Sequence, residues 1–189
     1  MIKFHISCLS SHFLILNNLL VYLFIMIQVT GKIWFDPKNV TKKHNTQSEW
    51  KKTAMVIFED DTTKYYSWFI KKRYNLELNR PLRGTHISFI NDSVRDMGDN
   101  ADKWEEIKEK YNGTEVTLTI DPDVKTDSKH WWLVVEYRSR KQLLDIRSEL
   151  GLGEPYFGMH LTVGYANSKN EEHSKYIHNL ITKYDGKYK

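Results

Sequence analysis

The chain has little of the residues that build several protein classes. Cys8 is the one cysteine in 189 residues, which excludes an intramolecular disulfide framework and a cysteine-rich zinc module. Nine glycines and four prolines are too few for a collagen-like or low-complexity chain. The sequence has no glycine-rich phosphate-binding loop and no activated serine or cysteine nucleophile motif. We therefore expect a globular domain in a reducing compartment, the cytoplasm (the host cytoplasm if the chain is viral), with no metal or cofactor.

Charge of one sign does not dominate either. The 28 Lys and Arg residues exceed the 24 Asp and Glu residues by four, and the isoelectric point is near 8.9. This excess is too mild and too evenly spread to establish nucleic-acid binding, but it suits a substrate that carries phosphate. Hydrophobic residues make up 40%, enough for the core of one domain or of two lobes.

Residues 13–29 form a long hydrophobic run at the start of the chain. The run is shorter than the about 20 residues that a membrane helix needs, and two adjacent asparagines lie near its middle. It also lacks the basic start and small-residue cleavage site of a signal peptide. We interpret residues 1–25 as translated upstream sequence, with Met26 as the start of a domain over residues 26–189. A membrane segment is the alternative.

The rest of the chain predicts alternating strands and helices in a repeated order. Strand, strand, helix, strand, helix occurs over residues 31–111 and again over residues 115–184. In the first half we expect strands at 32–35, 54–58 and 86–90, helices at 63–74 and 102–111, and a polar loop at 91–100. In the second half we expect strands at 115–120, 130–137 and 160–163, and helices at 139–150 and 171–184. This repeat predicts an α+β fold of two related halves.

Each half carries the same local pattern around its third strand. Both segments read P-x-x-G-x-H-x-[ST], namely Pro81–Ser88 (PLRGTHIS) and Pro155–Thr162 (PYFGMHLT). The bare H-x-[ST] triplet also occurs at His5 and His44, so the shared proline and glycine offsets distinguish the matched pair. Residues two apart on a strand point to the same face, so each histidine projects together with its hydroxyl residue. If the halves pack about a pseudo-twofold axis, the two pairs face each other across a cleft.

Two opposed imidazoles suit the cleavage of a phosphodiester. A base must activate the attacking hydroxyl and an acid must protonate the leaving oxygen, and histidine can do either near neutral pH. Serine and threonine hydroxyls can donate hydrogen bonds to the non-bridging phosphate oxygens. We therefore predict that His86, Ser88, His160 and Thr162 are the catalytic residues. The alternative is that the two histidines are unrelated core or surface residues.

This duplicated motif resembles the 2H phosphoesterase superfamily, which is named for its two H-x-[ST] motifs. The resemblance implies a bilobal α+β fold, with two antiparallel sheets around a central cleft, and metal-independent phosphodiesterase activity. Members act on 2′-5′-linked oligonucleotides, 2′,3′-cyclic phosphates, tRNA-splicing products and cyclic-oligonucleotide signals. The compact chain looks closest to phage anti-CBASS phosphodiesterases, which degrade host cyclic nucleotide messengers. A nucleotide or oligonucleotide is thus the expected partner, and no stable protein partner is expected.

Four further residues are candidates for substrate binding. Arg83 can bind a phosphate through two hydrogen bonds, although a solvated loop arginine is the alternative. Tyr156 lies just before the second histidine. Trp34 and Trp132 can stack on a base, and one of Trp132 and its neighbour Trp131 is expected in the core. The alternative function is a non-catalytic RNA- or nucleotide-binding module on the same fold.

Overall fold

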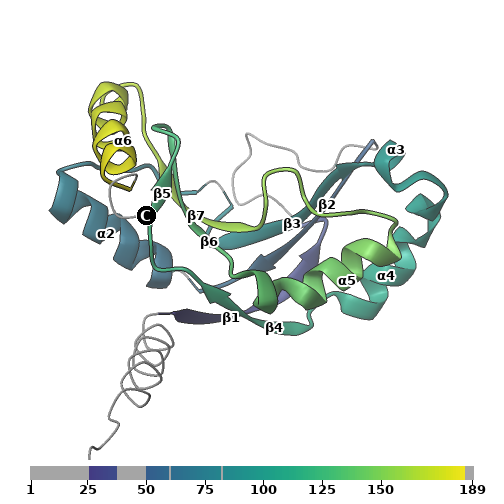
Figure 1. Ribbon diagram of the computed structural model, residues 1–189. Coiled ribbons are helices and arrows are strands. Elements are labelled where there is room, and N and C mark those ends of the chain that lie inside the picture. Colours follow the sequence, from purple (N-terminus) through teal and green to yellow (C-terminus); the bar gives the residue numbers. More distant parts are fainter. Residues whose placement is uncertain (1–25, 38–49, 60, 82, 186–189) are drawn as a thin grey trace, which may run out of the picture.

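The computed structural model describes residues 26–37, 50–59, 61–81 and 83–185 (Figure 1). The strands are β1 (Ile27–Phe35), β2 (Lys51–Ile57), β3 (His86–Ser93), β4 (Glu115–Ile120), β5 (Lys125–Thr126), β6 (His130–Val134) and β7 (His160–Tyr165). The helices are α2 (Asp61–Tyr74), α3 (Val94–Met97), α4 (Trp104–Tyr111), α5 (Lys141–Glu149) and α6 (Glu171–Asp185), with 3-10 turns at Gly98–Lys103 and Tyr137–Arg140. The predicted order of elements is present in both halves, with β5 and α3 as additions.

The strands of the described residues form one seven-stranded antiparallel sheet in the order β4-β1-β2-β3-β7-β6-β5. The α+β class is therefore confirmed, but the expected two sheets are joined into one. They meet where Ile87 of β3 pairs with Leu161 of β7. This pairing places both motif strands in the interior of the sheet, with β3 between β2 and β7 and β7 between β3 and β6. Ile120 lies at the end of the edge strand β4, and Val135 follows β6, which is next to the opposite edge of the sheet. These two residues form an isolated β-bridge, so the sheet curls into a half-barrel.

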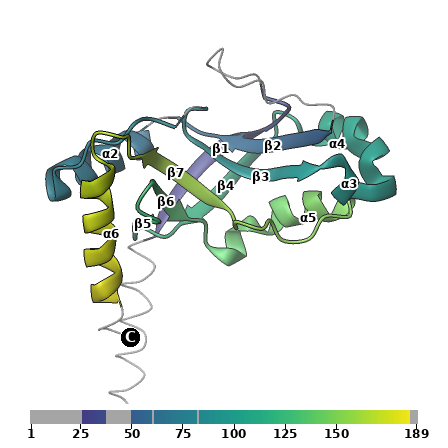
Figure 2. The same ribbon diagram turned by 90° about the horizontal axis from the view of Figure 1, so that it is seen from above.

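The helices gather in two groups at opposite ends of the sheet (Figures 1 and 2). One group is α2 with α6, and the other is α3, α4 and α5. Each group takes a helix from each half of the chain. Helix α2 precedes β3 but packs against β7, whereas α5 precedes β7 but packs against β3. This exchange ties the two halves into one structural unit.

Aromatic side chains anchor both helix groups to the sheet. Trp131 of β6 is fully buried, its ring lies 5.9 Å from that of Tyr74 on α2, and its Nε1 donates to Ser174 of α6 at 3.0 Å. At the other end, the Phe35 ring of β1 meets the buried Trp104 ring of α4 at 5.0 Å, edge to face. Trp131 is thus the core member of the Trp131–Trp132 pair, as one of the two was expected to be.

The predicted polar loop over residues 91–100 is wrong. Strand β3 continues to Ser93, and α3 follows at once. The Ser93 hydroxyl accepts from the Asp96 amide at 3.3 Å, while the Asp96 carboxylate accepts from the Ser93 amide at 3.0 Å. This capping box satisfies two backbone N–H groups at the helix start, which stabilises a helix in so polar a segment. Other elements differ only at their ends, as where β1 begins at Ile27 and β6 ends at Val134.

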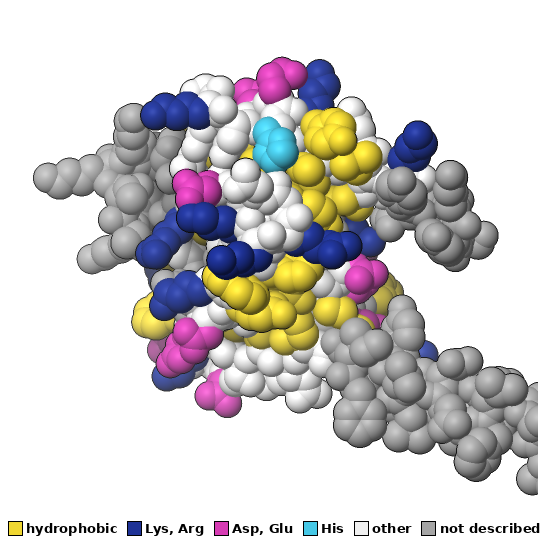
Figure 3. Space-filling model, turned by 90° about the vertical axis from the view of Figure 1, so that its left-hand side faces the viewer, with side chains coloured by type: hydrophobic (Ala, Val, Ile, Leu, Met, Phe, Trp, Pro, Cys, Tyr) yellow, Lys and Arg dark blue, Asp and Glu magenta, His cyan; other side chains and the backbone are white. Residues whose placement is uncertain are grey.

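The outer side of the α2 and α6 end exposes basic and aromatic side chains together. Tyr65 and Trp68 of α2 are each more than half exposed beside the exposed run Lys71–Arg73, and Figure 3 views this end. No helix of the described ranges is long and apolar enough to cross a membrane. Residues 1–25 and both decoy histidines, His5 and His44, lie outside the described residues.

Candidate active site

The two motif segments have the same turn before their strands. The Gly84 amide donates to the Pro81 carbonyl at 3.2 Å, and the Gly158 amide donates to the Pro155 carbonyl at 2.9 Å. Both glycines have a positive φ, 71° and 65°, which residues with a side chain rarely adopt. The shared proline and glycine offsets therefore encode a shared turn, which begins each strand at its histidine.

The two motif strands also share a β-bulge. In the β2–β3 ladder the register skips Phe89, and in the β6–β7 ladder it skips Val163. Each skipped residue comes directly after the hydroxyl residue of its motif, Ser88 or Thr162. The burial of side chains follows the same pattern in both strands, with histidine and hydroxyl partly exposed and the next two residues buried. Bulges occur often beside active sites, where they redirect side chains.

The four candidate catalytic side chains lie on one face of the sheet, here called the motif face. The central residues of the two motifs pair across β3 and β7. Antiparallel geometry then places His86 beside Thr162 and Ser88 beside His160. The pairs therefore lie side by side on neighbouring strands, and do not face each other across a cleft as expected. The histidines occupy one diagonal of this group and the hydroxyls the other, and diagonal neighbours in a regular ladder are about 7–8 Å apart.

Backbone carbonyls in the turns hold both imidazoles. The His86 Nδ1 lies 2.8 Å from the Gly84 carbonyl, which can only accept, so Nδ1 carries the proton and Nε2 can exchange one. Burial lowers the pKa of His86, the Gly84 carbonyl opposes this, and the charges of Arg83 and His160 lower it further. Since the His160 charge acts on His86, the two imidazoles are close enough to influence each other.

His160 has a similar but less cationic environment. Burial lowers its pKa, the carbonyls of Gly158 and Phe157 oppose this, and the charge of His130 lowers it slightly. Both imidazoles are thus shifted toward the neutral form by partial burial. A bound phosphate would favour the protonated form of one of them.

Each bulge is bound by the helix that precedes the other motif. The Phe89 carbonyl accepts from the Arg147 Nη1 of α5 at 2.6 Å, and the Val163 carbonyl accepts from the Ser67 hydroxyl of α2 at 3.5 Å. Arg147 is 2% exposed and forms an ion pair with Asp92 of β3 at 2.8 Å. We name Arg147 and Ser67 the bulge clamps. Their contacts join residues 58 and 96 positions apart, so no local sequence pattern signals them.

The structure places two of the four substrate-binding candidates at this group. Trp132 shares the motif face, paired with Thr162, and its ring lies 6.0 Å from the His160 ring. Arg83 is partly buried in the first turn, where its charge acts on His86.

The other two candidates lie farther away. Trp34 is on β1, 42% exposed, and pairs with Met55, which in turn pairs with Ser88. Tyr156 is 93% exposed at the tip of the second turn, and its ring packs edge to face on that of Phe157.

The register adds motif-face residues that the sequence pattern does not identify. Lys32 of β1 pairs with Ile57 of β2, which pairs with His86. This cross-strand row, Lys32–Ile57–His86, continues the motif face toward β1. Alternation along each strand would have placed these residues on one of two faces, but only strand order and register bring them together.

The described residues contain no group of three or more His, Cys, Asp or Glu side chains arranged to hold a metal ion. Comparison with protein-family models, with curated proteins and with solved structures finds no match for this chain.

Proposed function

We propose that the protein is a phosphodiesterase of the 2H type that cleaves a nucleotide or oligonucleotide without a metal. The observation that carries this proposal is the matched group of His86, Ser88, His160 and Thr162 on one face of two neighbouring strands. Two independent backbone devices, the glycine turn and the bulge, repeat around both motifs. Unrelated core or surface histidines would have no reason to share both.

In this proposal His86 is the base and His160 the acid. Burial lowers the pKa of both histidines, and the positive charge of Arg83 lowers that of His86 further, whereas His160 has only the titratable His130 as a cationic influence. Nε2 of His86 takes the proton of the attacking water or hydroxyl. As the new P–O bond forms and the old one breaks, protonated His160 gives its proton to the leaving oxygen. Solvent then restores both imidazoles, so one proton is taken and one returned per turnover.

The two hydroxyls act on the phosphate itself. Ser88 and Thr162 donate hydrogen bonds to the non-bridging oxygens, whose charge must be stabilised as the geometry at phosphorus changes. Arg83 adds a cation at one end of the group, which attracts the substrate. The substrates that fit are nucleotide phosphodiesters: 2′-5′-linked oligonucleotides, 2′,3′-cyclic phosphates, in which the phosphate bridges two hydroxyls of one ribose, and cyclic oligonucleotides. Cleavage of cyclic oligonucleotides would counteract host antiviral signals.

The test is turnover of bis-p-nitrophenyl phosphate and of a nucleotide panel, with product identification, on the wild type and on His86→Ala. Turnover that survives millimolar EDTA and is lost in the variant supports the proposal. Binding of nucleotides with no turnover in either protein would indicate a binding module. Activity lost in EDTA and restored by Mg²⁺ would replace the proposed mechanism with a metal-dependent one.

A further inference from the structure

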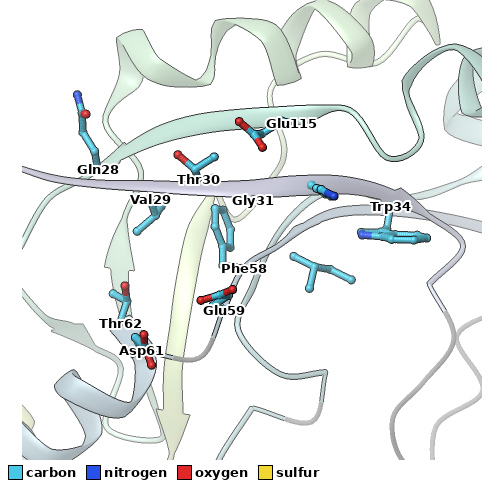
Figure 4. A pocket seen from close by; sticks show the side chains of 12 residues that line it. Gln28, Val29, Thr30, Gly31, Trp34, Phe58, Glu59, Asp61, Thr62 and Glu115 are labelled. Atoms are coloured by element: carbon cyan, nitrogen blue, oxygen red, sulfur yellow. The ribbon is translucent and has the colours of Figure 1, made fainter.

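A cavity of about 610 Å³ opens on the sheet beside β1, between β4 and the start of α2 (Figure 4). Its size is in the range of about 300–1,000 Å³ that small-molecule sites have. The lining does not include either candidate catalytic histidine. It includes Trp34 from β1, Phe58 and Glu59 from the segment after β2, Asp61 from the start of α2 and Glu115 from β4.

The cavity adjoins the phosphate site that we propose. Lys32 and Ile57 both line it, and they belong to the cross-strand row that ends at His86. Neighbouring strands are about 4.8 Å apart, so Lys32 on β1 lies two spacings, about 10 Å, from His86 on β3. A nucleoside attached to a phosphate at His86 has the length to cover Ile57 and enter the cavity.

Gly31 makes room for Phe58, one of the residues that line this cavity. A Cβ on Gly31 would lie 2.6 Å from Cδ1 of the Phe58 ring, too close for any side chain. One edge of the Phe58 ring therefore packs against β1 at Gly31 (Figure 4). Phe58 is 9% exposed and belongs to the core, so the exposed Trp34 ring toward the other end is the planar apolar surface on which a base can stack.

Carboxylates dominate the charged lining. Glu59 and Asp61 lie on one side of β1 and Glu115 on the other, against the single cation of Lys32 (Figure 4). Ionised carboxylates only accept hydrogen bonds. A net negative lining disfavours a second phosphate and favours an uncharged group with several N–H donors. Guanine has adjacent N1–H and 2-amino donors that match one carboxylate, whereas uracil presents one N–H between two acceptor carbonyls.

We propose that this cavity binds the nucleoside on one side of the scissile phosphate and selects guanine over uracil, with Glu59 and Asp61 as acceptors and Trp34 as a stacking surface. The inference rests on the proposed function for the position of the phosphate. It does not depend on turnover, because a nucleoside without phosphate should also bind.

The test measures binding and turnover separately on the full chain. Calorimetry with guanosine, inosine and uridine should give the tightest binding for guanosine, weaker binding for inosine, which lacks the 2-amino group, and the weakest for uridine. Glu59→Gln should weaken guanosine binding by about 10-fold, since a hydrogen bond to a charged group is lost. Glu109→Gln, an exposed carboxylate on α4 away from the cavity, is the matched control and should change nothing.

In turnover assays with the 2′,3′-cyclic phosphates, KM should be lowest for guanosine, higher for inosine and highest for uridine. The three substrates should have similar kcat. Trp34→Ala should raise KM for the guanosine substrate, and Trp34→Phe should restore most of it. Equal binding of guanosine and uridine, or guanosine binding unchanged in Glu59→Gln, would overturn the cavity assignment. Selective nucleoside binding without turnover of any substrate would support the cavity as a guanine site and reject the phosphodiesterase proposal. Turnover with no base preference would support the phosphodiesterase proposal and reject the guanine site.

Discussion

The first motif segment, Pro81–Phe89, and the second, Pro155–Val163, share their turn, their histidine and hydroxyl positions and their bulge, but they differ in what surrounds them. The first has a partly buried arginine in its turn, where the second has the exposed Tyr156–Phe157 pair. A buried ion-paired arginine clamps the first bulge, whereas a serine hydroxyl at 3.5 Å clamps the second.

This difference indicates how one repeated pattern can serve two chemical roles. Backbone geometry depends on the residues that repeat, the proline, glycine, histidine and hydroxyl. Burial is the largest effect on the pKa of both histidines, and the difference between them comes from residues that do not repeat, such as the Arg83 cation near His86. A symmetric fold with asymmetric neighbours can thus provide one base and one acid, as a phosphodiester cleavage needs.

The largest effect is expected from removing either histidine. General acid or base catalysis by one positioned group contributes about 10²–10⁴-fold. His86→Ala and His160→Ala should each lower kcat by that range with KM little changed, because each acts in the transition state. The loss of kcat in the double variant should be far smaller than the product of the two single losses, because both groups act in the same transition state. Initial rates on a cleaved substrate measure this.

His44→Ala, which removes a decoy triplet outside the described residues, is the control and should leave kcat unchanged. A loss in His44→Ala as large as in His160→Ala would show that the repeat identifies the wrong pair.

The two bulge clamps should differ strongly in their effect on stability. Arg147→Met leaves the Asp92 carboxylate without its buried partner and the Phe89 carbonyl without its donor, which should lower the free energy of unfolding by about 3–5 kcal/mol. Ser67→Ala removes one long hydrogen bond and should cost less than about 1 kcal/mol. Urea denaturation followed by fluorescence gives both values.

The double variant Arg147→Met/Asp92→Leu checks the cause of the first effect. Because it removes both charges, it should recover part of the stability lost in Arg147→Met alone. No recovery would mean that packing around Arg147, and not the unpaired Asp92 carboxylate, dominates the loss.

Local patterns were sufficient to predict the order of elements and to select four motif residues that the structure places on one face of the sheet. Hydrophobic alternation indicates strands such as Glu115–Ile120, whose bounds are confirmed, and the repeat identifies the histidines without any structure. The capping box at Ser93 was also present in the sequence as S-x-x-D, but the polar composition of residues 91–100 favoured a loop. That error was avoidable.

Long-range contacts were not predictable from the same patterns. The joining of the halves at β3 and β7 depends on strand order, and the bulges depend on register. Arg147 reads as an ordinary residue of an amphipathic helix, since its partners Phe89 and Asp92 lie in the other half of the chain. The cavity beside β1 likewise arises from segments that are distant in sequence.

Removing either motif hydroxyl should have a smaller effect than removing a histidine. Ser88→Ala and Thr162→Ala each remove one hydrogen bond to phosphate and leave the proton path intact, so each should lower kcat/KM by about 10-fold. Ser88→Thr and Thr162→Ser keep the hydroxyl and should retain most of the activity. If both exchanges abolished activity while both alanine variants kept it, space at these positions would matter and the hydroxyls would not.

The smallest effect, and the most direct test of the asymmetry, is in the pH dependence. Arg83→Gln removes a cation that lowers the pKa of His86, so that pKa rises. If His86 is the base, it must be neutral to act, and the acid limb of the kcat/KM profile moves to higher pH while the alkaline limb stays.

Phe157→Arg places a cation at the equivalent position of the second turn and lowers the pKa of His160. The acid is then lost at lower pH, so the alkaline limb moves down. This second shift should be the smaller one, because Phe157 is 83% exposed and solvent screens the new charge. Movement of the alkaline limb in Arg83→Gln, with the acid limb unchanged, would reverse the roles and make His160 the base.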